Sequence, residues 1–280
     1  MDIATHVGRQ EVAQDSADPT RIAGLAALLD HVSPPWSPGL LPPLGHWLCF
    51  PPQARQSAIG GDGHPLRDGT GLLPAVDLPR RMWVGSRIRF LGPIALGEAL
   101  IRTSTLVAAT PKTGRSGNML FVTVRHEIAG AGGETAIVDE QDIVYREAAE
   151  AGVIAARPAT DPGAIEAVTR SLTADPVMLF RYSALTFNGH RIHYDRDYAR
   201  DVEGYPGLVV HGPLIATLML DHLLRHCPAA SVASFDFRAL SPLFDGEPIL
   251  LGLDEIDGGA KLRAIGPAGP AMTATVGFAR

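Results

Sequence analysis

Cysteine is scarce in this chain, and several other features are missing. Only Cys49 and Cys227 occur, far apart, so we expect neither a disulfide framework nor a cysteine-based zinc site. No stretch approaches the roughly 18 consecutive apolar residues that span a bilayer, and the first residues carry charges where a secretory signal would be apolar. These absences predict a protein of the reducing cytoplasm that does not enter the membrane.

Basic charge is also in short supply. Lysine and arginine together number 24, against 30 aspartates and glutamates, which gives a net charge of −6. Such a chain has no excess of cations for a phosphate backbone, so nucleic acid is not expected as a partner. Apolar material is plentiful, because 46% of the 280 residues are hydrophobic. This is enough for a packed core in one large domain or in two smaller ones.

The first half combines one helix, a long irregular segment and a group of strands. Apolar residues recur at helical spacing in residues 21–32, after a start signal at Asp18. Residues 33–79 contain so many prolines and glycines that they predict a long ordered loop, and loops of that length are often binding loops or covers. Alternating β-branched residues then predict four antiparallel strands in residues 83–145.

The second half repeats this order of helix and strands after a linker. The stretch from Glu147 to Asp161 lacks strand patterning and is the expected linker. A helix is expected at residues 177–184, opened by Asp175, and a longer apolar helix at residues 214–225. Strands resume at Ser234.

A turn sequence occurs twice at a fixed distance. Arg89–Glu98 and Arg238–Glu247 share arginine, proline, glycine and glutamate at matching positions, separated by 238 − 89 = 149 residues. Such a turn could recur by chance, but each copy follows a helix and precedes further strands, which predicts an internal duplication. The expected fold is α+β, a double hotdog in which each half wraps an antiparallel sheet around a long helix. Residues 1–150 would form one hotdog and residues 160–280 the other. Since the histidine-rich segment 188–195 has no second copy in the first half, that half is expected to be non-catalytic and to line a pocket.

The densest group of reactive side chains lies at residues 188–195. A turn at Asn188 can bring its amide close to His193, so that the two side chains could hold one water molecule. Histidine suits proton transfer near neutral pH, whereas an amide can only orient its partner. The other interpretation is that these side chains merely cap a loop. A metal site formed by His190, His193 and Asp195 is a weaker alternative, because its spacing matches no known ligand set.

A second segment runs from Tyr205 to Leu214 and contains a glycine at an expected helix start. Backbone N–H groups there have no helical partners and lie at the positive end of the helix dipole. The Gly212 N–H could bind an enolate-like oxygen, an interaction worth about 3 kcal/mol in comparable sites. Equally, Gly212 could serve close packing between a strand-like segment and the helix.

Together these two segments resemble the MaoC-like (R)-specific enoyl-CoA hydratases, whose motif D-x-N-P-L-H-x-D is followed by I-V-H-G-M. The counterparts here are residues 188–195 and 209–213. The resemblance implies that His193 is the catalytic base, that Asn188 stands where the family has an aspartate, and that Gly212 supplies the oxyanion hole. Supporting roles would fall to His190, Tyr194, Asp195 and His211, with Tyr194 or Asp195 orienting the imidazole.

The form F-N-G-H-R-I-H-Y-D is similar to one branch of this superfamily, the two-hotdog hydratases of itaconyl-CoA and mesaconyl-C4-CoA (3-methylfumaryl-CoA). Mitochondrial type 2 hydroxyacyl-thioester dehydratases are similar as well. First-half segments such as Asp62-Gly63-His64-Pro65 extend the likeness. Substrates of this branch carry a free carboxylate, which calls for a cation in the pocket. The candidates are Arg55, Arg80, Arg81 and Arg191.

The resemblance predicts a hydro-lyase that adds water to an enoyl-CoA double bond and gives citramalyl-CoA. No metal is expected, and no cofactor beyond the coenzyme A of the substrate. Two alternatives stay open: a 3-hydroxyacyl-thioester dehydratase of fatty-acid synthesis, and a non-catalytic acyl-CoA-binding hotdog protein. Because hotdog domains commonly pair, the chain could be complete as an internal pseudo-dimer or could form a homodimer.

Overall fold

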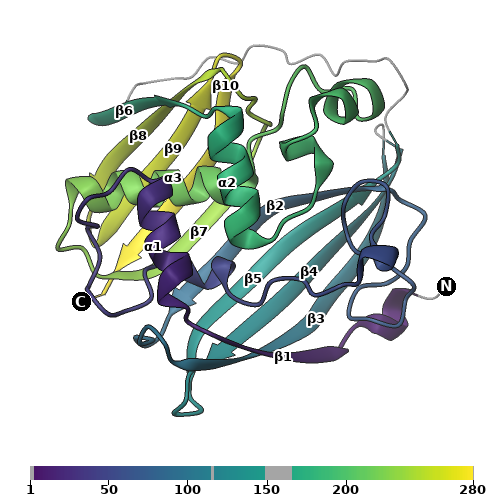
Figure 1. The fold of residues 1–280 in the computed structure, drawn as a ribbon, viewed down its shortest axis with the longest axis horizontal. Coiled ribbons are helices and arrows are strands. Elements are labelled where there is room, and N and C mark those ends of the chain that lie inside the picture. Colours follow the sequence, from purple (N-terminus) through teal and green to yellow (C-terminus); the bar gives the residue numbers. More distant parts are fainter. Residues whose placement is uncertain (1–2, 115–116, 149–165, 280) are drawn as a thin grey trace.

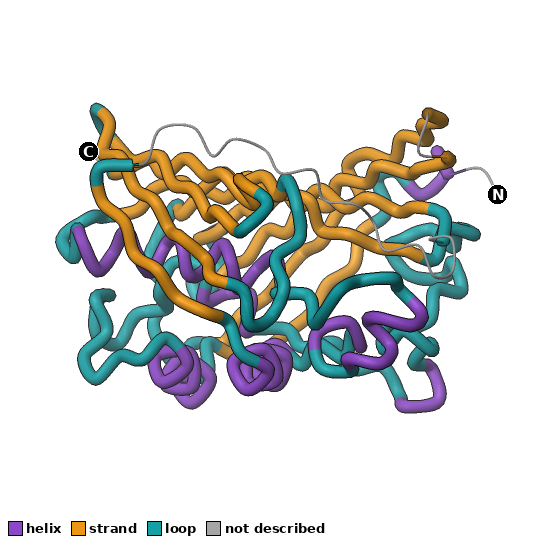
Figure 2. Tube along the Cα trace, turned by 90° about the horizontal axis from the view of Figure 1, so that it is seen from above, coloured by secondary structure: helices purple, strands orange, loops and turns teal. Residues whose placement is uncertain are grey.

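In the part of the chain that the structure describes, ten strands form one antiparallel sheet, and the α-helices lie on one side of it (Figures 1 and 2). The structure is a computed structural model that describes residues 3–114, 117–148 and 166–279. The strands are β1 (Gln10–Ser16), β2 (Arg80–Phe90), β3 (Ala99–Gly114), β4 (Gly117–Ala129), β5 (Thr135–Arg146), β6 (Val168–Thr173), β7 (Val232–Ala239), β8 (Pro248–Ile256), β9 (Gly259–Gly266) and β10 (Gly269–Phe278). The α-helices are α1 (Pro19–Leu28), α2 (Pro176–Thr186) and α3 (Gly212–His226), and the short helical segments are η1 (Ile3–His6), η2 (Gly45–Leu48), η3 (Gln56–Ala58), η4 (Arg191–His193) and η5 (Tyr198–Val202).

The sheet is built from two halves with the same strand order. The order β1-β3-β4-β5-β2 in the first half is mirrored by β6-β8-β9-β10-β7 in the second, and the halves meet where β2 pairs with β7. At the centre of that pairing Arg87 lies opposite Asp236, and 236 − 87 = 149, the same offset as the sequence repeat. The same offset relates Gly85 to Ser234 and Arg89 to Arg238, so it exchanges the pair Gly85–Arg238 at one end of the ladder with the pair Arg89–Ser234 at the other. The two halves are therefore related by a pseudo-two-fold axis at this pair, which is the geometry of a self-complementary dimer contained in one chain.

Helices α1 and α2 occupy equivalent places after the first strand of each half. Both begin with the sequence Ala-Asp-Pro, and the aspartate caps the helix: Asp18 accepts from the Thr20 N–H at 2.8 Å and Asp175 from the Met178 N–H at 2.7 Å. Proline at the first helical position costs no hydrogen bond, because that N–H would have no helical partner. The short local signal thus fixes where both helices start.

Helix α3 has no counterpart in the first half. It packs against β8, β9 and β10, and its residues 214–224 are all buried. Figure 2 shows it between the strands and the end-on helices α1 and α2. The expectation of a long helix in both halves thus holds for the second half alone, since α1 has only 10 residues. In the first half the outer strands are instead covered by loop side chains, namely Leu72, Leu73, Val76 and Leu78. Prolines and glycines exclude a long helix there.

Most of the other predicted helices and strands are present, but the structure also contains two strands that the sequence pattern does not predict. The three predicted helices correspond to α1, α2 and α3, the four first-half strands correspond to β2–β5, and the long loop is present with only short helical turns. The sequence pattern does not predict β1 or β6, which are short edge strands rich in polar residues. The linker expected from Glu147 to Asp161 falls mostly on residues 149–165, outside the described residues, so the boundary between 1–150 and 160–280 stays a prediction. None of the helices in the described residues is long and apolar enough to cross a membrane.

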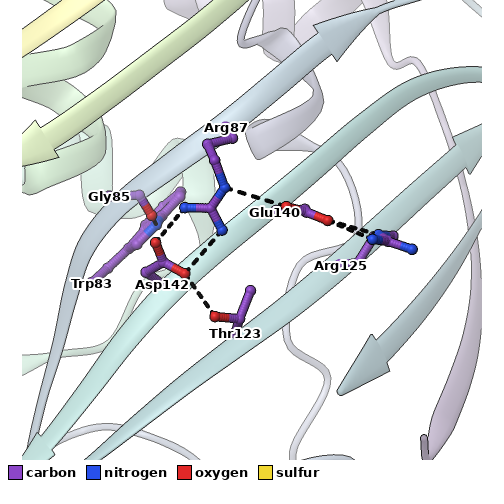
Figure 3. A network of polar contacts seen from close by, with 7 residues as sticks. All are labelled: Trp83, Gly85, Arg87, Thr123, Arg125, Glu140 and Asp142. Carbon is purple, nitrogen blue, oxygen red and sulfur yellow. Dashed lines mark hydrogen bonds and ion pairs between the residues drawn. The ribbon is translucent and has the colours of Figure 1, made fainter. Parts of the chain in front are cut away.

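A buried carboxylate ties α3 to its surroundings. Asp221 is 3% exposed and binds Arg170 of β6 at 2.7 Å, Arg225 one helical turn later at 2.8 Å, and the His31 ring beyond α1. A second network lies on the outer face of the first half, where Arg87 of β2 binds Glu140 and Asp142 of β5, and Arg125 of β4 also binds Glu140 (Figure 3). Because the outer network is largely exposed, the buried one contributes more to holding the fold.

Replacement of Asp221 should destabilise the protein strongly. Asp221→Ala leaves Arg170 and Arg225 without their buried partner, so the free energy of unfolding should fall by about 3–5 kcal/mol. Urea denaturation followed by tryptophan fluorescence measures this change. The control is Asp197→Ala, which removes a carboxylate that is 84% exposed and should change the stability by less than about 0.5 kcal/mol. Equal stability of the two variants would contradict the role given to Asp221.

Candidate active site

The candidate site begins where α2 ends. Phe187 adopts a left-handed conformation (φ 51°) that turns the chain back, and the Asn188 N–H then donates to the Ser183 carbonyl at 2.8 Å. The Asn188 side-chain oxygen accepts from the His190 N–H at 3.0 Å. Among the described residues the amide nitrogen of Asn188 donates no hydrogen bond. The turn therefore uses the side-chain oxygen of Asn188 as an acceptor and leaves its NH2 group available to donate to a ligand.

His193 lies in η4 and is only 7% exposed. Its Nδ1 is 2.7 Å from the Val209 carbonyl oxygen, which can only accept, so Nδ1 carries the proton of the neutral ring and Nε2 carries the lone pair. Burial lowers the pKa of His193 to about 4, although the bond to Val209 acts in the opposite direction. At neutral pH His193 is thus an uncharged base with one fixed tautomer.

A second buried histidine is stacked on the first. The rings of His211 and His193 are parallel, with centroids 3.6 Å apart and an interplanar angle of 17°. His211 Nε2 lies 2.9 Å from the Ser183 hydroxyl, while its buried Nδ1 has no partner. Burial, followed by the charges of His193 and His190, lowers the pKa of His211 well below its ordinary value. The stack fixes the plane of the His193 ring in a site that disfavours added positive charge.

The first half contributes one further ring, His64, and one carboxylate, Asp62. His64, from the long loop, lies 4.1 Å from His190 between ring centroids, and its Nδ1 is 3.0 Å from Asp62. Burial lowers the pKa of His190 to about 2, and the charges of His64 and His193 act in the same direction. Burial alone would raise the pKa of Asp62, but its hydrogen bonds from His64 outweigh this and lower it to about 2. The site is therefore assembled from both halves.

Sequence reasoning gave Asp62 and His64 no role. The segment Asp62-Gly63-His64-Pro65 was part of the family likeness, and that likeness is the signal from which they could have been found. Their contact with His190 depends on a close approach of two backbones: a Cβ on Gly63 would lie 1.8 Å from the Gly189 carbonyl oxygen. A glycine is required there, since any side chain would collide with main chain.

Gly212 lies at the first position of α3, immediately after His211. Within the described residues its N–H donates to no protein group, as expected for the first turn of a helix. A Cβ at Gly212 would have only the Trp83 carbonyl oxygen within contact, at 3.8 Å. Tight packing around the side-chain position therefore does not explain this glycine, and an N–H at the positive end of a helix is suited to binding an anionic oxygen.

Tyr194 and Asp195, expected to orient the imidazole, bind elsewhere. The Tyr194 hydroxyl donates to the Gly189 carbonyl at 2.9 Å, and Asp195 accepts from Arg191 and from the Tyr198 N–H. The main-chain carbonyl of Val209 holds the ring of His193 instead. A main-chain partner has no sequence signature, which is why the motif pointed to its polar neighbours.

Among the described residues, the side chains of the alternative metal site, His190, His193 and Asp195, are not brought together as ligands, but another group is. In the described residues, ligand atoms of Asp62, His64 and His190 lie within 4.8 Å of one another, a spacing that could hold a cation. The Asp62 carboxylate already accepts from the His64 ring and from the His64 N–H. A metal ion would have to replace these bonds, so the arrangement is explained without one.

Comparison with known proteins places this site in a family. The chain matches the family model of hydroxyacyl-thioester dehydratase type 2 over residues 44–245. It is 45% identical over 276 residues to mesaconyl-C(4)-CoA hydratase of Chloroflexus aurantiacus, covering 96% of this chain and 95% of that protein. It is 29% identical over 238 residues to the mitochondrial hydroxyacyl-thioester dehydratase type 2 of Schizosaccharomyces pombe, covering 77% and 78%.

Solved structures share the fold. A MaoC-like dehydratase from Phytophthora capsici aligns with a TM-score of 0.71 at 14% sequence identity, covering 100% of this chain and 98% of that one. At that identity the likeness concerns the fold alone, and it confirms the fold expected from the duplicated turn and the two motif segments.

The tautomer and the pKa of His193 can be measured without any assay of activity. Nitrogen-15 NMR of the histidine rings should show one residue as the neutral Nδ1–H tautomer with a pKa of about 4, since Nδ1 faces the Val209 carbonyl. His193→Gln should remove that set of signals and so identifies it. An Nε2–H tautomer, or titration near 6.5, would contradict the geometry described above.

Proposed function

Because the chain belongs to the hydroxyacyl-thioester dehydratase type 2 family, we propose that it is an acyl-CoA hydratase whose substrate is mesaconyl-C4-CoA and whose product is citramalyl-CoA. The 45% identity to mesaconyl-C(4)-CoA hydratase over nearly the whole of both chains supports this substrate. The observation that carries the reaction class is the His193–Val209 hydrogen bond, which leaves the lone pair on Nε2 of a neutral ring. This ring is stacked on His211, the residue directly before the Gly212 N–H.

The first proposed step is the addition of water. His193 Nε2 removes a proton from a water molecule that the Asn188 amide holds, and the water oxygen bonds to the β-carbon of the enoyl thioester. The electron pair of the double bond moves toward the thioester carbonyl, which becomes an enolate. Asn188 serves this step as a donor rather than as a second base, because an amide cannot take up a proton at neutral pH.

The enolate oxygen is the group that needs stabilisation. The Gly212 N–H at the positive end of α3 is the proposed donor to it, and a preorganised donor of this kind contributes about 3 kcal/mol to transition-state binding. Loss of water in the opposite direction passes through the same enolate, so the donor serves both directions.

The second proposed step returns the proton to carbon. The imidazolium of His193 is a strong acid in this buried site, since burial lowers its pKa to about 4. It therefore releases the proton readily to the α-carbon, which completes the net addition of H and OH and restores the neutral base. The proton stays within the site throughout.

The second candidate is a 3-hydroxyacyl-thioester dehydratase of fatty-acid synthesis, which runs the same chemistry in reverse. The family description and the Schizosaccharomyces pombe relative favour it. A non-catalytic acyl-CoA-binding protein is the third, and the fixed tautomer of His193 beside a free N–H argues against it, because binding alone needs neither.

We extend the proposal to the cofactor, the partner, the cellular location and the oligomeric state. The proton-transfer groups and the oxyanion donor all belong to the chain, so the proposed reaction uses no cofactor and no metal. The acyl-CoA thioester is the proposed partner, and the cytoplasm is the proposed location. Association into a homodimer is a proposal of the same kind.

The direct test is a spectrophotometric assay of enoyl-thioester absorbance with mesaconyl-C4-CoA, itaconyl-CoA and crotonyl-CoA. Wild type should hydrate mesaconyl-C4-CoA, and His193→Ala should lower kcat/KM by about 100-fold or more, since the base is lost. The control is His226→Ala, which removes a histidine that is 40% exposed at the far end of α3 and should leave kcat/KM unchanged. Activity on crotonyl-CoA or longer chains alone would select the fatty-acyl dehydratase, and inactivity on every substrate would select the binding protein.

The proposed oxyanion donor can be tested separately. Gly212→Ala adds a methyl group that meets no protein atom closer than 3.8 Å, so the thermal midpoint should stay within about 2 °C of wild type. The methyl group occupies space beside the N–H, and kcat/KM should fall by about 10-fold or more. Unchanged activity in a folded variant would remove Gly212 from the site.

A further inference from the structure

Two of the four candidate arginines already bind acceptors of the chain, and a third is exposed. Arg80 binds the Glu203 carboxylate at 2.9 Å and the Glu203 carbonyl at 2.7 Å. Arg191 binds Asp195 and the Gly61 carbonyl, and its guanidinium lies over the Tyr198 ring. Arg55 is exposed at the start of η3. A substrate anion would have to compete with the existing acceptors of Arg80 and Arg191.

Arg81 differs from these three. It is half-buried on β2 opposite Tyr145 of β5, and directly paired residues point to the same face of a sheet. Tyr145 belongs to the buried cluster under the long loop, so Arg81 also points toward that inner face. Among the described residues the Arg81 side chain has no hydrogen bond and no ion pair. Its charge contributes to lowering the pKa of His190, after burial and the charges of His64, His193 and Asp62.

Tyr145 supplies an independent observation. Its side chain is 0% exposed, yet its hydroxyl has no hydrogen-bond partner. The guanidinium of Arg67, from the long loop, lies 4.5 Å over the Tyr145 ring, and the buried Nη1 of Arg67 is also without a partner. Buried polar groups are normally paired, and each exception in a native fold calls for an explanation. Within the described residues, the Arg81 side chain, the Tyr145 hydroxyl and Arg67 Nη1 therefore have no hydrogen-bond acceptor. Neighbouring donors without an acceptor are expected at an anion-binding site before the anion binds.

The position of these donors suits the proposed substrate. Trp83 lies two residues beyond Arg81 on β2, about 7 Å along a strand, and its carbonyl oxygen would lie 3.8 Å from a Cβ built on Gly212. In mesaconyl-C4-CoA the free carboxylate is attached to the β-carbon, the atom that water attacks. A thioester oxygen bound at Gly212 would therefore place this carboxylate a few ångströms away, within reach of an arginine side chain on the same strand.

We propose that Arg81, with the Tyr145 hydroxyl and the Arg67 guanidinium, forms the subsite that binds the free carboxylate of a dicarboxylyl thioester. This inference rests on the proposed hydratase activity and adds the group that selects its substrate. Arginine binds a carboxylate through two parallel N–H donors, and tyrosine adds a third bond. Crotonyl-CoA has a methyl group in place of the carboxylate, so it would leave these donors unpaired in the complex.

The test compares two substrates across matched variants. Arg81→Gln should lower kcat/KM for mesaconyl-C4-CoA by about 10- to 100-fold, and Tyr145→Phe by about 5- to 10-fold. Neither variant should lower kcat/KM for crotonyl-CoA. The control is Arg89→Gln, an exposed arginine further along the same strand, which should change neither value. Tyr145→Phe removes only the unpaired hydroxyl, so its thermal midpoint should equal or exceed that of wild type.

The results of this assay distinguish a failure of the carboxylate subsite from a failure of the proposed hydratase function. If wild type hydrates mesaconyl-C4-CoA and Arg81→Gln loses activity equally on both substrates, or on neither, the subsite is wrong and the hydratase stands. If wild type hydrates crotonyl-CoA but not mesaconyl-C4-CoA, the hydratase chemistry stands, while the dicarboxylyl substrate and the subsite both fall. Inactivity of wild type on all three thioesters overturns the function and the inference together.

Discussion

The antiparallel pairing of β2 with β7 is the contact from which the arrangement of this protein follows. It joins two five-stranded halves, and its register decides which first-half residues meet the start of α3. Trp83 lies just beyond the end of this ladder, after a bulge, packed against Phe237 of β7, with its carbonyl near Gly212. A slip by one residue would turn Trp83 and Arg81 to the outer face. The candidate site thus depends on hydrogen bonds between main-chain groups that take no part in chemistry.

Duplication within one chain has allowed the two halves to differ. The second half keeps α3, whose first residue offers its N–H to the site, and the turn that holds Asn188 and His193. The first half has a long loop in the corresponding place, and this loop delivers His64 to His190 and Arg67 to Tyr145. A symmetric homodimer would carry each feature twice, whereas this chain can specialise one half for proton transfer and the other for recognition.

The parts of the fold that depend on local signals could be predicted from the sequence. The caps at Asp18 and Asp175, the proline after Gly212 and the alternating strands placed three helices and most of the sheet. The turn motif also pointed to Asn188 and His193. Contacts made through tertiary structure could not be read in this way: the Val209 carbonyl that fixes His193, the approach of Gly63 to Gly189, and the unpaired hydroxyl of Tyr145. Main-chain acceptors and missing partners leave no mark in a single sequence.

The stacked rings of His193 and His211 set the proton capacity of the site. Two imidazolium ions with centroids 3.6 Å apart would repel each other strongly in a buried environment, so the pair of neutral rings can take up one additional proton at most. A proton taken from water has to leave before another can arrive. In the proposed reaction the pair would therefore carry one added proton at a time, and C–O bond formation and proton return would be coupled one to one in every turnover.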